Sequence, residues 1–339
     1  MAGHANLGAA KAAKNDEFYT QWNDIENEMQ AYLEYNPDVF RDKTILLPCD
    51  DPDWSNFTKY FAERFEQLGL KKLISTSYAA DGGNGKMFVL EGENEPQWGY
   101  LAGDGDFRSD EVTALRDEAD IVVTNPPFSL FREFMAWLIE GEVEFSVIGS
   151  MNAIGYKEIF PLIKGNEMWL GASRMGAKYF ALPSNAPVKA NQHEENGVRF
   201  QKFGNIAWFT NIQHGRRHEP LPLMTMGDNL RYNKRIMDSP NSYKNYDNYD
   251  AIEVPVTSGI PSDYEGVMGV PISFLDKYNP EQFEIIGTSD GALAASLGVK
   301  PLGPEYEGNV GRTKLGLAST RKAVFRRIII RHRNPGAGS

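Results

Sequence analysis

The chain has 339 residues, a net charge of -11 and a single cysteine, Cys49. The length suits one large α/β domain with an appended region, and one cysteine excludes a disulfide framework and fits a reducing cytosol. The acidic balance argues against a protein that coats nucleic acid, because polyanion binding depends on Lys and Arg beside phosphates. No apolar run approaches the roughly 18 residues that cross a bilayer, and the N-terminus has no signal-peptide core, so we expect a cytoplasmic protein without membrane contact.

Strands and helices alternate after a small, polar N-terminal stretch, residues 1–14, which we expect to form a flexible arm. Apolar residues at steps of three and four predict helices, and Ser55, Ser109 and Gly69 are suitable capping residues. The expected helices are residues 24–35, 55–69, 109–119, 129–141 and 156–166. Short apolar runs predict strands, which are residues 43–48, 71–78, 120–124, 144–150 and 167–171, with a hairpin formed by 86–92 and 96–103.

Two further apolar segments, residues 178–183 and 205–212, have no helix between them and predict an antiparallel hairpin at one edge of the sheet. The alternation elsewhere predicts an α/β fold with a doubly wound, mostly parallel sheet. After about residue 220 the periodicity fades, Tyr, Asn, Asp and Pro dominate, and basic residues become denser. We therefore expect a separate, loop-rich region from residue 221 to residue 339.

Acidic, amide and aromatic side chains follow the predicted strands, at the edge of the sheet where open α/β folds bind ligands. The segments concerned are "PCDDPDWSNF" at 48–57, "SYAADG" at 77–82, "GDGDFRS" at 103–109 and "NPPF" at 125–128. In the last of these, Pro126 and Pro127 fix φ and lack an N–H, and Pro126 favours an extended Asn125. The sequence therefore predicts a stiff turn whose carbonyls face outward.

Such a turn can activate a weak nucleophile. The side-chain oxygen of Asn125 and the carbonyl of Pro126 could accept two hydrogen bonds from one exocyclic –NH2 group, whose lone pair is delocalised into its ring. Two fixed acceptors would localise that lone pair and stabilise the positive charge that develops on attack, without a metal. Phe128 could stack against the base. The alternative is an ordinary Pro-Pro turn with a core Phe.

Several segments of the chain closely resemble the EcoRI-type family of adenine-specific DNA methyltransferases. They are residues 14–30, 49–61, 68–75, 103–109, 120–133, 244–254 and 266–286, so the resemblance runs from about Lys14 to about Ile286. It implies methyl transfer from S-adenosylmethionine to N6 of an adenine flipped out of double-stranded DNA. It also implies a seven-stranded Rossmann-like catalytic domain over residues 15–220, and target recognition by residues 221–339.

The resemblance assigns roles to individual residues. The catalytic residues are Asn125, Pro126, Pro127 and Phe128. The cofactor-binding residues are Phe18, Tyr19, Thr20, Asp50 and Asp51 near the methionine moiety, and Asp106 and Phe107 near the adenine. Trp208 or Phe209 packs near the flipped base. The first cofactor motif departs from the usual pattern because it has no glycine before Asn56, and the acid after the second strand is missing, so Ser77, Tyr78 or Asp81 could hold the ribose.

Basic residues could hold the DNA backbone, although such clusters are usually solvated surface. The candidates are Lys11, Lys14, Arg216, Arg217, Arg231, Lys234 and Arg235. His214 and His218 have a metal-like spacing, but no Cys or further His accompanies them, so we interpret them as surface or phosphate contacts and expect no metal. We expect a monomer, since one catalytic unit can treat each half of a palindrome in turn.

Other interpretations stay open. Asp50 and Asp51 could cap a helix, Asp104 and Asp106 could form turns, and Tyr19 and Trp208 could be core residues. A methyltransferase of an RNA base or a protein glutamine would present the same Asn-Pro-Pro turn, but a glutamine methyltransferase would not need the basic region after residue 220. An inactive DNA-binding relative is a third class. A restriction endonuclease partner and a short palindromic site such as GAATTC are compatible with the resemblance.

Overall fold

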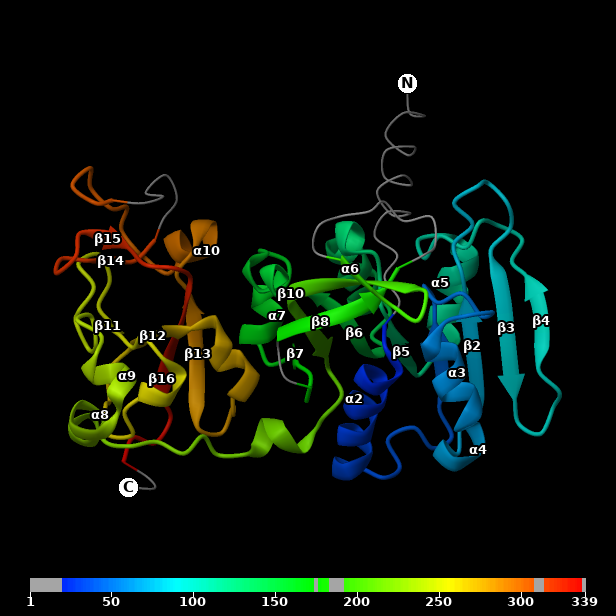
Figure 1. The fold of residues 1–339 in the computed structure, drawn as a ribbon, viewed down its shortest axis with the longest axis horizontal. Coiled ribbons are helices and arrows are strands. Elements are labelled where there is room, and N and C mark those ends of the chain that lie inside the picture. The colour runs from blue at the N-terminus through cyan, green and yellow to red at the C-terminus, as the bar shows by residue number, and fades with distance from the viewer. Residues whose placement is uncertain (1–19, 174–175, 183–191, 308–313, 337–339) are drawn as a thin grey trace. The chain divides into compact units, whose positions relative to one another are not determined.

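A computed structural model of the chain describes residues 20–173, 176–182, 192–307 and 314–336 (Figure 1). The chain divides into two compact units. The first consists of the described residues of Met1–Ile154 and Met168–Gly215, and the second of those of Gly155–Glu167 and Arg216–Ser339. Within the described residues, no helix is long and apolar enough to cross a membrane.

The first unit is built on a mixed sheet with a parallel centre. Its strands are β1 (Thr44–Leu47), β2 (Lys72–Thr76), β3 (Lys86–Glu91), β4 (Gln97–Tyr100), β5 (Ile121–Thr124), β6 (Glu144–Ser150), β7 (Trp169–Leu170), β8 (Gly176–Ala181), β9 (Gln192–Glu195) and β10 (Val198–Thr210). The order is β4-β3-β2-β1-β5-β6-β10-β7, and β8 and β9 also pair with β10. Strands β2, β1, β5 and β6 run parallel, whereas β3–β4 and β10 join them antiparallel.

This sheet confirms the α/β class and the parallel centre, but not the expected count of seven strands, because the described residues form ten. The β3–β4 hairpin adds two strands at one edge, as the sequence predicts. At the other side, β8 and β10 do pair antiparallel, but β10 also pairs with β6 and β7 and therefore lies inside the sheet. The additional strand β9, which the sequence analysis does not predict, extends this side.

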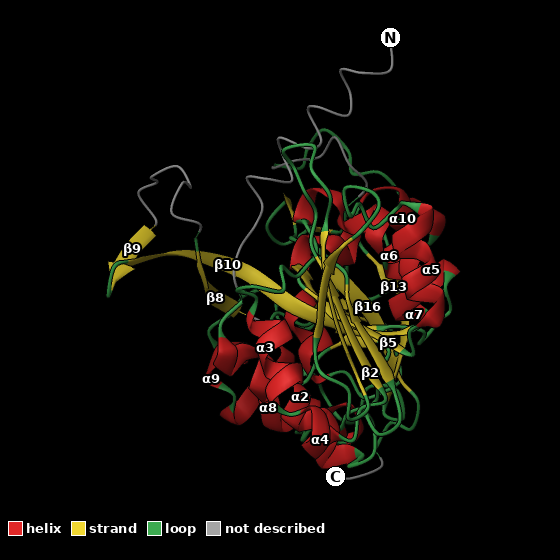
Figure 2. Ribbon diagram, turned by 90° about the vertical axis from the view of Figure 1, so that its right-hand side faces the viewer, coloured by secondary structure: helices red, strands yellow, loops and turns green. Residues whose placement is uncertain are grey.

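Helices cover both faces of the sheet in the first unit (Figure 2). Those on one face are α2 (Trp22–Tyr35), α3 (Asn56–Glu63) and α4 (Phe65–Leu68), and those on the other are α5 (Asp110–Glu118) and α6 (Phe131–Glu140). Side chains alternate along each strand, so Ile45 and Leu47 pack in the core beneath α2 and α3. The doubly wound arrangement places the carboxyl ends of the four parallel strands at one edge.

Local capping explains where these helices begin and end. The Ser55 hydroxyl accepts from the amide of Phe57 at 3.1 Å, and the Ser109 hydroxyl accepts from Val112 at 3.3 Å, as predicted. Gly69 ends α4 with φ +64°, a conformation that favours glycine. The helix expected over residues 55–69 is interrupted at Arg64, where α3 stops and α4 starts.

The second unit has sheets of its own. Its strands are β11 (Ile252–Glu253), β12 (Met268–Pro271), β13 (Phe283–Thr288), β14 (Gly316–Leu317), β15 (Lys322–Ala323) and β16 (Arg327–His332), ordered β11-β12-β16-β13 and β14-β15. Its helices are α7 (Phe160–Lys164), α8 (Met226–Tyr232), α9 (Lys234–Met237) and α10 (Gly291–Ser296). Short 3-10 turns, such as η1 (Phe128–Leu130) in the first unit and η5 (Ile272–Lys277) here, occur in both units. The helix expected over residues 156–166 forms only as α7, with Pro161 in its first turn.

Candidate functional site

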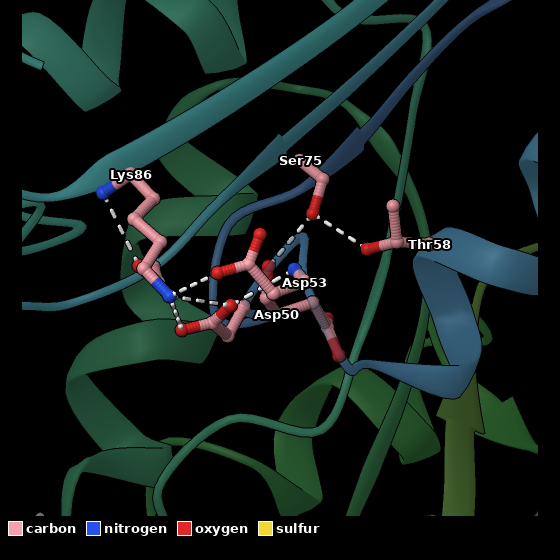
Figure 3. A network of polar contacts seen from close by, with 7 residues as sticks. Asp50, Asp53, Thr58, Ser75 and Lys86 are labelled. Atoms are coloured by element: carbon pink, nitrogen blue, oxygen red, sulfur yellow. Dashed lines mark hydrogen bonds and ion pairs between the residues drawn. The ribbon is translucent and has the colours of Figure 1, made fainter. Parts of the chain in front are cut away.

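The loops that follow β1, β2 and β5 meet at the carboxyl edge of the parallel strands, and Asp50 lies at their centre. Its carboxylate accepts from the hydroxyl of Ser55 at 2.7 Å and from that of Thr124 at 2.6 Å, and the side chain is buried. The Ser75 hydroxyl donates to the Asp50 carbonyl at 2.7 Å and also contacts the Thr58 hydroxyl at 2.7 Å (Figure 3). Burial raises the pKa of Asp50 to about 7, against the opposing effect of the bonds from Thr124 and Ser55.

Each carboxylate oxygen of Asp50 thus accepts one hydrogen bond from within the protein, and the cofactor contact that the resemblance implies for Asp50 stays a prediction. Asp50 is also more than a simple helix cap. Ser55 caps α3, and Asp50 in turn holds Ser55, while the same carboxylate reaches the last residue of β5. One buried acid therefore joins the loop after β1 to the strand that precedes Asn125.

The neighbouring Asp51 points to a different partner. Lys86, the first residue of β3, lies 2.9 Å from the Asp51 carboxylate. It also lies 2.5 Å from the Asp53 carboxylate (Figure 3). The Asp53 bond is the main cause that raises the pKa of Lys86. The Asp51 side chain is 16% exposed and that of Lys86 37% exposed, so both charges remain reachable from solvent. A carboxylate and an ammonium group therefore lie side by side at the end of β1.

The loops after β2 and β4 interlock through glycines. A Cβ atom on Gly85 or on Gly105 would collide with the carbonyl oxygen of Ser77, which explains why both positions require glycine. The Ala79 amide donates to the Asp104 carbonyl at 2.7 Å. The three ribose candidates, Ser77, Tyr78 and Asp81, lie in the loop after β2. The Ser77 hydroxyl accepts from the Lys86 amide, and the Asp81 carboxylate accepts from the Gly83 amide.

Asp104 and Asp106 act here as turn formers. The Asp104 carboxylate accepts from the Asp106 amide at 3.0 Å, and the Asp106 carboxylate accepts from the amide and guanidinium of Arg108. Burial alone would raise the pKa of Asp106, but the bonds from Arg108 outweigh it and lower the pKa. Phe107 is buried against Phe134 and Trp137, 5.0 and 5.6 Å between ring centroids, and its contact with the adenine of the cofactor stays a prediction.

The turn after β5 carries the four residues predicted to be catalytic. Pro127 has φ -56° and ψ 125°, and its carbonyl accepts from the Leu130 amide at 3.0 Å, which starts η1. Phe128 is half-buried, with its ring 6.3 Å from that of Phe203 in an edge arrangement. The Oδ1 atom of Asn125 is buried. Asn125 must therefore change its rotamer, or its surroundings must open, before this oxygen can accept from a substrate.

Other residues singled out from the sequence take structural positions. Trp208 and Phe209 are fully buried on opposite faces of β10, against Phe57 and Phe131 respectively. Thr20 is buried, and its carbonyl accepts from the Asn56 side chain at 2.8 Å. Four predicted residues lie outside the described part of the chain, namely Lys11, Lys14, Phe18 and Tyr19.

The basic candidates divide into two groups. Arg231, Lys234 and Arg235 are exposed on α8 and α9. Arg216 instead pairs with Asp276 at 2.6 Å, and Arg217 is buried against Asn166, where burial lowers its pKa.

The two histidines lie in different surroundings, and the surface position expected for His214 is wrong. His214 is buried beside the Leu170 carbonyl, 3.0 Å away, and His218 faces Glu281 at 3.2 Å. Among the described residues, no group of three or more His, Cys, Asp or Glu could hold an ion.

A cavity of about 540 Å³ is lined by residues of β8, β9 and β10 and by Gln21. His193 and Phe200 stack in its wall, 5.3 Å between centroids, and Lys202 lies over the Tyr179 ring at 5.5 Å. None of the site residues predicted from the sequence lines this cavity. The sequence analysis therefore did not predict its aromatic wall.

Comparison with known proteins decides the family. The profile described as "Adenine-specific methyltransferase EcoRI" matches residues 6–100 and 91–333. The chain belongs to this family. It is 43% identical over 322 residues to Type II methyltransferase M.EcoRI of Escherichia coli, covering 88% of this chain and 94% of that protein. It is also 39% identical to Type II methyltransferase M.MpnI of Mycoplasma pneumoniae, covering 82% and 83%, and 39% identical to M.MgeORF184P of Mycoplasma genitalium, covering 83% and 85%. No solved structure matches.

Membership of this adenine-specific methyltransferase family confirms the enzyme class that the sequence motifs predicted. The structure adds residues that sequence reasoning missed. Thr124 and Lys86 are absent from the predicted set, although each contacts an aspartate that was included. Thr124 directly precedes the Asn-Pro-Pro turn and could have been noticed there. Lys86 carries no local signal, because its partners lie 35 and 33 residues away.

Proposed function

We propose that this enzyme transfers a methyl group from S-adenosylmethionine to N6 of an adenine flipped out of double-stranded DNA. The observation that carries the proposal is the Asn125-Pro126-Pro127-Phe128 turn, placed directly after β5 at the carboxyl edge of the parallel strands. This edge is where α/β sheets bind their ligands. Flipping the base out costs a few kcal/mol, and the enzyme's contacts to the base and the DNA backbone must offset this cost.

The turn performs the chemistry by positioning and electrostatics. The side-chain oxygen of Asn125 and the carbonyl of Pro126 accept hydrogen bonds from the two N–H groups of N6. The nitrogen lone pair is then held toward the methyl donor, and the positive charge that grows on N6 is stabilised. The proton leaves to water afterwards. Phe128 supplies a stacking face worth about 1–3 kcal/mol.

The charged pair at the end of β1 fits the cofactor. The methionine part of S-adenosylmethionine has one ammonium and one carboxylate, and Asp51 and Lys86 offer one group of each opposite sign within 2.9 Å of each other. Asp51 would bind the amino group and Lys86 the carboxylate. Thr20 directly follows Phe18 and Tyr19 in the sequence and belongs to the same predicted cofactor-binding segment. When bound, the cofactor supplies an electrophilic methyl group on its sulfonium.

Exposed cations of the second unit would hold the DNA backbone. Arg231, Lys234 and Arg235 lie on α8 and α9 beside exposed apolar side chains, among them Tyr232, which is 66% exposed. Cations release condensed counterions when they meet phosphates, which supplies affinity without sequence specificity. We also propose that the catalytic and DNA-recognition functions divide at residue 220. The enzyme would act as a cytoplasmic monomer and have a partner endonuclease.

A transfer assay separates the proposal from its rivals. The protein is incubated with S-adenosylmethionine labelled in the methyl group and with duplex DNA containing GAATTC, RNA of the same sequence, or unfolded protein. We expect label in DNA, recovered as N6-methyladenine after digestion to nucleosides. We also expect the Asn125→Ala variant to bind cofactor normally and to transfer nothing. Label found only in RNA or in glutamine, or full turnover by the variant, would overturn the proposal.

A further inference from the structure

Asp50 and Thr124 form the direct link between the loop after β1 and the predicted catalytic turn. The Thr124 hydroxyl donates to Asp50 at 2.6 Å, and both side chains are buried. Thr124 is the last residue of β5, so its carbonyl carbon is bonded to the Asn125 nitrogen. Any rotation of the Thr124 peptide therefore moves Asn125.

The Asp50 end of this link is itself held firmly. The Asp50 amide donates to the Thr76 carbonyl at 2.9 Å, its carbonyl accepts from Ser75 at 2.7 Å, and its second carboxylate oxygen accepts from Ser55 at 2.7 Å. These bonds come from β2 and from the start of α3. The carboxylate is thus a fixed point against which the end of β5 is held.

We propose that Asp50 is a positioning residue, which acts through Thr124 to hold the Asn125 turn in the geometry needed for methyl transfer. This inference rests on the proposed function of the turn. The two prolines stiffen the turn internally, and the bond to Asp50 adds to the pairing of Thr124 with Val147 of β6 in fixing the residue before the turn. Transfer is sensitive to such fixing, because a displacement of about 1 Å at a reacting group can lower a rate about a hundredfold.

The test removes one hydroxyl at constant side-chain shape. Thr124→Val deletes the donor to Asp50, whereas Thr124→Ser keeps it. Thr76→Val is the matched control, because Thr76 is also a fully buried threonine at the end of a parallel strand, β2, but its hydroxyl reaches the Pro48 carbonyl at 3.3 Å. The methyl-transfer rate is measured in a single turnover, and the Kd for S-adenosylhomocysteine by calorimetry, below the unfolding temperature of every variant.

We expect Thr124→Val to slow transfer at least about tenfold with a Kd within about twofold of wild type. Thr124→Ser should recover the rate to within about threefold, and Thr76→Val should match wild type. Asp50→Leu, which removes both acceptor oxygens, should slow transfer at least as much as Thr124→Val does, and adding Thr124→Val to it should slow transfer little further, because the bond between the two residues is already lost.

Three results would overturn the inference. They are a wild-type rate in Thr124→Val, an equal slowing in Thr76→Val, or a Kd for S-adenosylhomocysteine weakened more than tenfold by Asp50→Asn alone, which would make Asp50 a cofactor ligand. Failure of the wild-type protein to methylate DNA at all would instead overturn the proposed function. The two failures are therefore distinguishable.

Discussion

The Thr124 hydroxyl donates to the Asp50 carboxylate at 2.6 Å, across 74 residues of sequence. The bond joins the strand that leads into the Asn-Pro-Pro turn with the loop in which the family resemblance places cofactor contacts. Its neighbour Asp51 is turned toward Lys86 instead. The two adjacent aspartates therefore have different partners: Asp50 accepts from two buried hydroxyls, and Asp51 pairs with the partly exposed Lys86.

Asp50 should make stability depend on pH. Its pKa in the folded protein is raised to about 7 from an ordinary 3.8, so the folded state retains a proton that the unfolded chain has lost. The stabilising contribution is complete below about pH 4 and disappears as pH rises through 7, with a slope of about 1.4 kcal/mol per pH unit. Asp50→Asn cannot lose this proton. Urea unfolding at pH 5 and pH 8 should show a smaller loss of stability in Asp50→Asn than in wild type, and parallel losses would contradict the assignment.

Ser55 should contribute more to stability than an ordinary capping serine. Ser55→Ala removes the cap of α3 and also the donor to the buried Asp50, whereas Ser109→Ala removes only the cap of α5. A lost cap costs about 1 kcal/mol, and leaving a buried carboxylate oxygen unpaired costs about 1–3 kcal/mol more. Chemical denaturation of the two variants measures the difference. Equal losses would show that the Ser55–Asp50 bond adds nothing.

Cofactor affinity should depend on Asp51 and not on Asp53. Both aspartates contact Lys86, but the Asp53 side chain is 54% exposed, against 16% for Asp51. We expect Asp51→Asn to weaken S-adenosylhomocysteine binding at least about tenfold, and Asp53→Asn to change it less than about threefold. Calorimetric titration of both variants decides the matter. Similar affinities in the two variants would remove Asp51 from the cofactor site.

DNA affinity should lose part of its salt dependence when the exposed cations of α9 are neutralised. The slope of log K against log salt should fall by about 0.9 for each phosphate that the protein no longer neutralises, so by about 2 in Lys234→Gln/Arg235→Gln. Arg216→Gln is the control, because Arg216 already pairs with Asp276 and should leave the slope unchanged. Fluorescence anisotropy over a range of salt concentrations gives both slopes. A slope that changes in Arg216→Gln but not in Lys234→Gln/Arg235→Gln would contradict the assignment of phosphate contacts to α9.

The local part of this structure follows from the sequence, because its causes are local. Ser55, Ser109 and Gly69 cap helices through bonds within a few residues, and the apolar runs of β1 and β5 are buried as their composition predicts. The strands of the second unit were not predicted, since several have only two residues and their pairing depends on distant partners, as β12 does on β16.

The site was predicted in outline but not in its contacts. Motif spacing placed Asn125 and Asp50 at one edge, but whether an aspartate faces a ligand or a buried hydroxyl depends on a partner far along the chain. Trp208 and Phe107 illustrate the same difficulty, because the sequence gives the aromatic ring and only the fold determines that it is enclosed. Neither position has a local signal that separates a core ring from a stacking ring.

The central claim is that two oxygens of the turn after β5 hold the reacting nitrogen of adenine. The most direct measurement is a crystal structure of the enzyme with S-adenosylhomocysteine and duplex DNA containing its site. We predict that the Oδ1 atom of Asn125, which is buried in the protein alone, becomes accessible and lies about 3 Å from adenine N6, together with the Pro126 carbonyl. An adenine that remains in the duplex, or whose N6 lies beyond hydrogen-bond distance of both oxygens, would contradict the account.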